Sequence, residues 1–129
     1  MAFSSKNLML GIEAKWNAAA ARDTYGPIYF EKGPRNTGVQ FLTWEVEEVT
    51  HEEATQQQVD KIAYHLIAHA TSELIATAMA DAMAAVFDES LLTITGYTCY
   101  RNHRTGFDTE FDNGSWRALL RFEAWTQEN

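Results

Sequence analysis

Residues 59–87 (VDKIAYHLIAHATSELIATAMADAMAAVF) contain two hydrophobic patterns in succession. The first has a period of two, which places alternate side chains on opposite faces of a β-strand: Ile62, Tyr64, Leu66 and Ala68 on one face, and Lys61, Ala63, His65, Ile67 and His69 on the other. The second has helical spacing, and its apolar positions are Leu74, Ile75, Ala78, Met79, Ala82, Met83 and Val86. Thr71 or Ser72 can cap the helix, because a hydroxyl there accepts a backbone N–H. The pattern predicts a strand that leads directly into a helix packed on the same sheet.

This helix is rich in alanine. Six alanines lie between residues 76 and 85: Ala76, Ala78, Ala80, Ala82, Ala84 and Ala85. Because these side chains are small, the helix can pack closely against more than one partner. We therefore expect one side of the helix to lie in the core and the surplus alanines, among them Ala80 and Ala84, to contact another subunit. A bulky charged residue at either of these positions is expected to block assembly without changing the melting temperature of the monomer.

The N-terminal segment also has helical periodicity. Ser4 or Ser5 can cap it, and its apolar side consists of Leu8, Ile12, Trp16, Ala19 and Ala20. The helix is expected to end near Tyr25, because the following Gly26 and Pro27 cannot continue it. Residues 28–30 (IYF) then form an edge strand, and residues 32–38 form a turn.

Residues 39–49 (VQFLTWEVEEV) predict a strand with both faces at least partly covered. The next segment, residues 47–58 (EEVTHEEATQQQ), is polar and strongly acidic, and we expect a long loop there. Two interpretations of the loop are open: a hairpin tip without a function, or a segment that becomes ordered on a partner.

Two further strands are predicted at residues 91–101 and 116–125. The second of them has one apolar face, made of Trp116, Ala118, Leu120, Phe122 and Ala124. Residues 102–115 connect the two strands as a loop that contains Asn113-Gly114, a strong signal for a hairpin turn.

The order of elements is therefore α-β-β-β-α-β-β. This order favours an α+β fold, with a small, mainly antiparallel sheet of about five strands and two helices packed on it. We find no internal repeat or linker, so residues 1–129 are expected to form a single domain.

Several apolar residues fall on the face of the sheet that should point away from the helices. They are Ala63, Ile67, Leu119 and Trp125, and they lie beside Arg117 and Arg121. An apolar patch on the outside of a domain indicates contact with another chain. Alternatively, the first helix or a loop folds over the patch.

Composition narrows the range of functions. The chain has a formal net charge of −8, which argues against a surface that coats nucleic acid, because phosphate binding depends on clusters of Lys and Arg. The single cysteine, Cys99, is expected to be a buried apolar group in a reduced protein. No segment has the roughly 20 apolar residues of a membrane span or the apolar run of a signal peptide, so we expect a soluble, cytosolic protein without membrane contact.

The candidate chemical motifs do not predict a catalytic, cofactor or metal site. On a strand, His65 and His69 are about 13 Å apart, too far to share a metal ion. His51, Glu52 and Glu53 are more typical of solvated loop charge than of a metal site. On a strand, Cys99 and His103 point the same way but lie too far apart for a nucleophile and its base.

A spacing typical of calcium loops occurs at Asp108, Glu110 and Asp112. The glycine and the terminal glutamate of an EF-hand are missing from their places, so an acidic hairpin tip is the better interpretation.

The succession of segments resembles tail terminator (tail completion) proteins of long-tailed bacteriophages over nearly the whole chain. The residues that carry the resemblance are the N-terminal helix, the segment 26–30 (GPIYF), the strand at 39–49, the long polar loop, the strand that runs through Thr71 into the alanine-rich helix, and the closing WRALLRFEAW. The resemblance is one of order, length and pattern, without a diagnostic motif.

The resemblance implies an α+β virion protein that is not an enzyme and uses no cofactor. Such proteins form a homo-hexameric ring that caps the tail tube, ends its polymerisation and joins the neck or head. Their partners are the tail tube protein and a neck or head completion protein, and DNA only passes through the lumen of the ring. The protein would thus be part of the virion tail or neck, assembled in the cytoplasm of a host bacterium.

On this basis the candidate contacts between subunits are Ala63, Ile67, Ala80, Ala84, Arg117, Leu119, Arg121 and Trp125. The candidate contacts with the tube are Glu47, Glu48, His51, Glu52 and Glu53 in the acidic loop. Two alternatives are open: a neck or head-to-tail joining protein, and a small-ligand-binding or enzymatic α+β domain. The latter would have a cleft between helix and sheet lined by Tyr64, His65, Tyr97 and Trp116.

Overall fold

The computed structural model describes residues 5–31, 40–54, 57–112 and 114–129, with the backbone alone at residues 5, 51–54, 57, 58 and 112. The elements in chain order are α1 (Ser5–Asn17), α2 (Ala21–Tyr25), β1 (Ile28–Phe30), β2 (Phe41–Ala54), β3 (Gln57–Ala70), α3 (Glu73–Phe87), β4 (Tyr97–Asp112) and β5 (Ser115–Glu128). The predicted α+β fold is confirmed.

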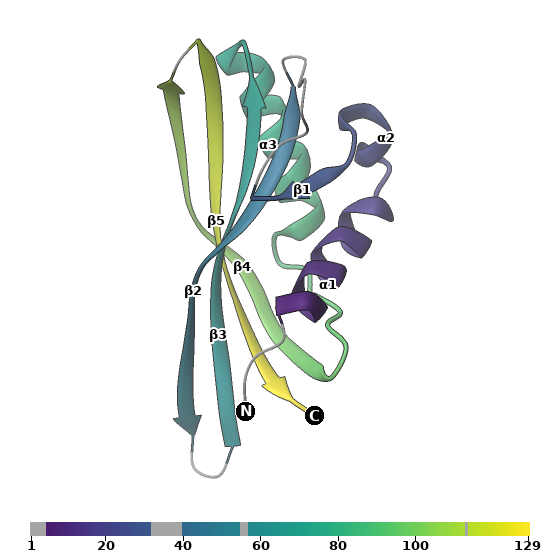
Figure 1. The fold of residues 1–129 in the computed structure, drawn as a ribbon, viewed down its shortest axis with the longest axis vertical. Helices are drawn as coiled ribbons and strands as arrows, with labels where there is room; N and C mark the ends of the chain where they lie inside the picture. Colours follow the sequence, from purple (N-terminus) through teal and green to yellow (C-terminus); the bar gives the residue numbers. More distant parts are fainter. Residues whose placement is uncertain (1–4, 32–39, 55–56, 113) are drawn as a thin grey trace.

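The five strands form one strongly twisted sheet in the order β1-β2-β3-β5-β4 (Figure 1). β1 is short and runs parallel to β2, while the other neighbouring strands are antiparallel. The predicted edge strand at residues 28–30 is confirmed as β1, which covers only the first part of β2, at Leu42 to Trp44.

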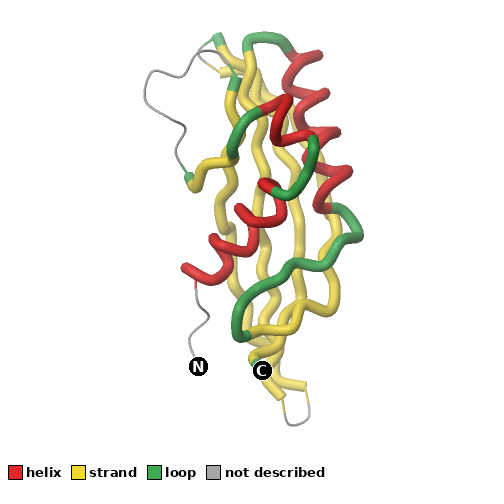
Figure 2. Tube along the Cα trace, turned by 90° about the vertical axis from the view of Figure 1, so that its right-hand side faces the viewer, coloured by secondary structure: helices red, strands yellow, loops and turns green. Residues whose placement is uncertain are grey.

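All three helices lie on the same face of the sheet (Figure 2). Apolar side chains between the helices and this face make a single core, whose largest fully buried members are Trp16, Trp44, Tyr64, Phe87, Phe122, Leu8, Ile12, Leu42, Ile62, Leu66, Met79 and Met83. Ile62, Tyr64 and Leu66 are fully buried on the side of β3 that faces the helices, which confirms the prediction that these residues belong to the core.

Helix α3 begins where the sequence predicts. The Ser72 hydroxyl accepts a hydrogen bond from the Ile75 N–H at 3.5 Å, and the acidic side chain of Glu73 lies in the first turn, where the helix dipole favours it. The apolar stripe is only partly as predicted, since the buried residues are Ala76, Met79, Ala80, Met83 and Phe87. Leu74, predicted to be apolar-facing, is 79% exposed. The helix is thus turned so that its alanines at 76 and 80 allow a close approach to the sheet.

The predicted N-terminal helix is in fact two helices. Leu8, Ile12 and Trp16 are buried as expected, but α1 ends at Asn17 and α2 begins at Ala21. The indole Nε1 of Trp16 donates to the Gly26 carbonyl at 2.8 Å and holds the end of α2 against α1. The break lets the chain turn back toward β1.

The prediction of a long loop at residues 47–58 is wrong, because the described residues of this segment belong to β2 and β3. β2 continues to Ala54 and β3 begins at Gln57, and the two strands pair from Phe41↔His69 to Ala54↔Gln57. Residues 55–56 of the predicted loop, like the predicted turn at 32–38, lie outside the described residues. The described helices do not reach the end of this hairpin (Figure 1), so the segment needs no hydrophobic alternation, and the pairing of its backbone makes it a strand.

The loop predicted at residues 102–115 is also wrong. Residues up to Asp112 belong to β4, which pairs with β5 as far as Asp112↔Ser115, so two residues connect the strands. One of them, Gly114, has a φ of 76°, which suits a hairpin turn. The strand predicted to begin at residue 91 begins at Tyr97, and Leu92 and Ile94 instead fill the core from an irregular segment.

Candidate assembly surfaces

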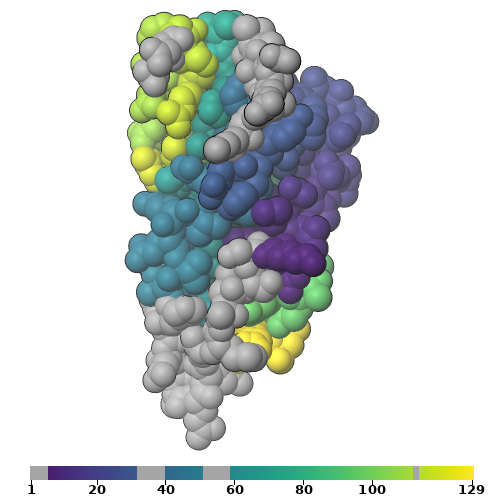
Figure 3. Space-filling view, in the orientation of Figure 1, coloured from purple at the N-terminus to yellow at the C-terminus, as the bar shows by residue number. Residues whose placement is uncertain are grey.

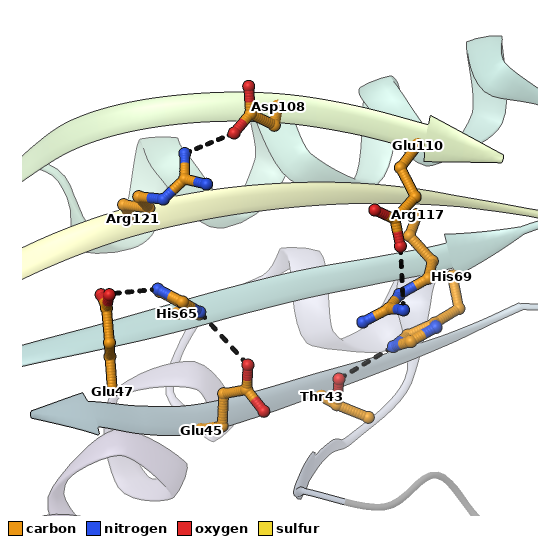
Figure 4. Close-up of polar contacts among 9 residues, drawn as sticks. All are labelled: Thr43, Glu45, Glu47, His65, His69, Asp108, Glu110, Arg117 and Arg121. Atoms are coloured by element: carbon orange, nitrogen blue, oxygen red, sulfur yellow. Dashed lines mark hydrogen bonds and ion pairs between the residues drawn. The ribbon is translucent and has the colours of Figure 1, made fainter. Parts of the chain in front are cut away.

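The face of the sheet opposite the helices carries no other element in the part of the chain that the structure describes (Figure 1). We call it the open face. Charged side chains of neighbouring strands pair across it (Figure 4). Arg121 Nη1 lies 2.5 Å from Asp108 Oδ2, and Arg117 Nη1 lies 3.1 Å from Glu110 Oε1. The four side chains are 36–61% exposed, so these pairs add little stability but arrange the charges of β4 and β5.

His65 lies on the open face between two glutamates. Its Nδ1 is 3.2 Å from Glu45 Oε1 and its Nε2 is 2.9 Å from Glu47 Oε2 (Figure 4). Glu45 and Glu47 share this face because they are two residues apart on β2, and a bulge between Val46 and Glu48 brings Glu48 to the same face, opposite Ala63.

His69 lies on the same face in a more apolar setting. Its ring stacks on Phe41 with centroids 4.1 Å apart, and its Nε2 lies 2.9 Å from the Thr43 hydroxyl. Burial, and secondly the positive charge of Arg117, lower its pKa from 6.5 to about 4. His69 is therefore neutral in the folded protein near pH 7. His65 and His69 have separate partners, as their predicted spacing on a strand requires.

The open face carries part of the predicted subunit contacts. Ala63, Leu119 and Trp125 are half-buried there, and Lys61 Nζ lies 5.6 Å from the centre of the Trp125 ring. Ile67, however, is only 3% exposed, because its neighbours on the sheet cover it. Arg117 and Arg121 are already engaged in the ion pairs described above. The apolar surface that the open face offers is thus smaller than the sequence predicts.

Ala80 and Ala84 lie on the other side of the sheet, in α3. Ala80 is fully buried in its own subunit, and Ala84 is half-buried against the same core. The small side chain of Ala80 thus serves the packing of α3 onto its own sheet, and a contact of this residue with a neighbouring subunit stays a prediction.

The predicted tube contacts occupy β2 rather than a loop. Glu47 and Glu48 are exposed on this strand, and the backbone of His51, Glu52 and Glu53 pairs with Asp60, Val59 and Gln58 of β3. The last β3–β5 pair in this direction is Val59↔Gln127, so the ends of β2 and β3 extend beyond the rest of the sheet (Figure 1). We call β2 residues 51–54 and β3 residues 57–58 the hairpin arm.

Both edges of the sheet are accessible. β4 forms one edge along its whole length, and β2 forms the other edge beyond Trp44, where β1 ends. Figure 3 shows residues of β2 exposed at the surface below β1. An edge strand has unpaired backbone N–H and C=O groups, which can pair with another chain.

The structure does not assemble the alternative ligand cleft. Tyr64 is fully buried on the helix side of β3, and the next residue, His65, is on the open face. The Tyr64 hydroxyl donates to Asn102 Oδ1 at 2.5 Å, and Asn102 Nδ2 donates to the carbonyls of Phe87 and Ser90, each at 2.9 Å. Burial raises the pKa of Tyr64 well above its usual value, so the phenol stays protonated. This network holds β3, β4 and the end of α3 together.

Cys99 and His103 do not form a pair either. A bulge at Tyr100 changes the register of β4, so Cys99 is buried toward the core while His103 pairs in register with Glu123 of the open face. The prediction that both side chains point the same way is wrong for this reason. Burial raises the pKa of the Cys99 thiol, as expected for an apolar environment.

Other features of a ligand site are weak. Among the described residues, no group of three or more His, Cys, Asp or Glu side chains is arranged to hold a metal ion. An open hollow of about 420 Å³ lies between α3 and β4, lined by Thr77, Asp81, Arg104, Thr105, Gly106 and Phe107. None of the helices described is both long and apolar enough to cross a membrane.

Some residues of these surfaces were not recognised in the sequence. From the sequence, Asp108 and Glu110 are predicted in a hairpin tip, whereas in the structure each forms an ion pair with an arginine of β5. These ion pairs require β4 to extend to Asp112 beside β5. The signal in the sequence that could have predicted this extension is the presence of acids at 108 and 110 and of arginines at 117 and 121, on either side of the turn.

Comparison with known proteins places the fold. No family model matches the sequence, and no curated protein matches it. A chain in a solved structure of the virion of a native gene transfer agent particle has a similar fold, with a TM-score of 0.81 over 93% of this chain and 94% of that chain, at 14% sequence identity. A second solved structure, of a protein without a descriptive name, has a TM-score of 0.67 over 99% of this chain and 98% of that one, at 11% identity. At such identities the likeness establishes a shared fold.

Proposed function

We propose that this protein is a structural component of a phage-like virion, and that it caps the tail tube as a ring of identical subunits. The ring would end polymerisation of the tube and provide the joint to the neck or head. The observation that carries this proposal is the match of nearly the whole chain to a chain of a gene transfer agent virion, with a TM-score of 0.81. The order of segments that resembles tail terminator proteins points to the same role.

The surfaces of the subunit support assembly rather than chemistry. A closed ring repeats one heterologous interface, so each subunit needs two different adhesive surfaces. The open face, with Ala63, Leu119 and Trp125, offers one region for contact with other chains, and the two sheet edges offer others. We take the ring to be a hexamer, as the family resemblance implies.

The hairpin arm is the proposed contact with the tube. It extends beyond the rest of the sheet, so in a ring whose axis runs along the strands it would project from one end. Its sequence carries Glu52 and Glu53 beside His51, which favours a partner surface with positive charge. DNA would pass through the lumen, and the neck or head completion protein would contact the opposite end.

Pull-down of the full-length protein with purified tail-tube and neck proteins of the same particle tests this proposal. We expect binding to the tube end, rings visible by negative-stain electron microscopy, and tails of uncontrolled length when the gene is removed. The double variant Glu52→Lys/Glu53→Lys should still form rings but lose the tube. Lys6→Glu, on the exposed surface of α1, is the control for a change of surface charge.

The same experiment distinguishes a tail-capping protein from a protein that joins the neck or head to the tail. A protein that binds a portal or its adaptor and ignores tube ends is a neck or head-to-tail joining protein, and the capping function would then be wrong.

A further inference from the structure

The two free edges of the sheet differ in charge at the same height. Residues 97–104 of β4 (YTCYRNHR) include Arg101, His103 and Arg104 and no acid, whereas residues 45–54 of β2 (EVEEVTHEEA) include five glutamates and neither Lys nor Arg. Pairing across the sheet sets the heights: Arg101 is in register with Trp125, Trp125 with Lys61, and Lys61 with Thr50. The basic stretch of one edge therefore lies level with the acidic stretch of the other.

Neither stretch has a strand on its outer side among the described residues, and in the basic stretch the Arg104 N–H donates to Asp88 Oδ1 at 2.9 Å. β1 covers β2 only at Leu42 to Trp44, so the acidic stretch below it has no strand beside it among the described residues. The side chains of Arg101, Arg104 and Glu48 are exposed. Arg101 and Glu48 lie on the same face, since their register partners Trp125 and Ala63 both belong to the open face.

The strand directions allow the edges to meet. β2 runs antiparallel to β3, β3 to β5 and β5 to β4, so β4 is antiparallel to β2 within one subunit. Rotation about an axis along the strands preserves both direction and height. The β4 of one subunit would then lie antiparallel to the β2 of the next, with Arg101 facing the stretch around Glu48 and Thr50. Opposite charges on neighbouring strands stabilise such a pair and select its register.

We propose that the subunits join edge to edge, with residues 101–104 of β4 on one copy against residues 46–50 of β2 on the next copy. This inference rests on the proposed ring but not on the identity of its partners in the virion. Bulges at Tyr100 and Thr105 bracket residues 101–104, which keeps the regular edge short and limits indiscriminate pairing. The inference assigns Glu48 to the contact between subunits rather than to the tube.

Charge reversal tests the pairing. Arg101→Glu and Glu48→Arg should each weaken self-association by about ten-fold or more, because like charges would face one another at every interface of the ring. The double variant should recover most of the loss. Self-association in solution is measured by analytical ultracentrifugation over a range of concentrations, and ring formation on tube ends by negative-stain electron microscopy. Lys6→Glu is the matched control. Thermal melting of the monomer should stay unchanged in all variants. Failure of the double variant to recover association would overturn the proposed pairing.

Disulfide cross-linking provides an independent measurement. Arg101→Cys/Thr50→Cys in one chain should give an oxidised ladder that ends at the closed ring, whereas Arg101→Cys alone should give no species larger than a dimer. Cross-linked rings that ignore the tube would support the pairing and contradict the capping function. Rings on tube ends without cross-links would contradict the pairing and leave the capping function intact. A chain that stays monomeric in every assay contradicts the pairing.

Discussion

Single side chains decide how the sheet is held to α3. Asn102 is 2% exposed and takes part in three hydrogen bonds, with Tyr64, Phe87 and Ser90. Its position on β4 follows from the bulge at Tyr100, which turns residue 102 toward the core. A polar residue at this place gives no signal in the sequence, since nothing in the local pattern marks it as buried.

Replacing Asn102 should therefore destabilise the monomer. Asn102→Leu removes the partners of the Tyr64 hydroxyl and the Ser90 carbonyl and leaves the Phe87 carbonyl with only the Ser90 N–H, so we expect a loss of about 3 kcal/mol in the free energy of unfolding. Tyr64→Phe removes one of these bonds and should cost about 1 kcal/mol. Urea denaturation measures both. The exposed Asn17→Ala is the control, and an equally small loss in Asn102→Leu would show that the network contributes little.

His69 links stability to pH. Its pKa is about 4 in the folded protein and 6.5 when unperturbed, so between these values the unfolded chain binds more protons than the folded chain. Stability should therefore fall as the pH is lowered from 6.5 toward 4. His69→Gln can still bond to Thr43 but does not titrate, and its melting temperature should fall less over the same range. Equal slopes for the two proteins would contradict this role of His69.

At the next level, helix α3 illustrates a close approach that depends on small residues. Ala76 and Ala80 face the sheet, so the helix packs near it, while Leu74 is left exposed at the start of the helix. The alanine content was correctly predicted to allow close packing. Which alanines face the core could not be read from the sequence, because small apolar residues surround the helix on nearly every side.

Two substitutions separate core alanines from surface alanines. Ala80→Glu places a carboxylate in a fully buried position, and we expect it to lower the free energy of unfolding by about 3 kcal/mol or more. Ala78→Glu, at an exposed position of the same helix, should melt within a few degrees of the wild type. Circular dichroism melting curves distinguish them, and a folded Ala80→Glu that fails only in assembly would support the interface role predicted from the sequence.

The whole molecule is a sheet with helices on one face and an open face on the other. The open face is lined by paired charges around the half-buried Leu119, and the two edges carry opposite charges. If the open face contributes to contact between chains, Leu119→Glu should leave the melting temperature of the monomer unchanged and weaken ring formation. Comparison with Arg101→Glu separates the face from the edge. Unimpaired rings in Leu119→Glu would assign the open face to another partner or to solvent.

Much of the fold follows from local patterns. Alternation in β3, the face made by Leu8, Ile12 and Trp16, and the Ser72 cap each depend on a single segment, because the side chains that repeat along it are those that become buried. These patterns were sufficient for the order of elements and for the α+β class.

The strand structure of the second half of β2 and of most of β4 could not be predicted from the sequence, because it depends on pairing with neighbouring strands. Residues 47–54 and 102–112 are largely polar on both faces, so no periodic burial marks them, and they are strands because their backbones pair across the sheet. The same pairing exposes two edges at matching heights and brings Asp108 and Glu110 to their arginines. Surfaces for assembly arise between strands that are distant in the sequence, and they became visible once the register of the sheet was known.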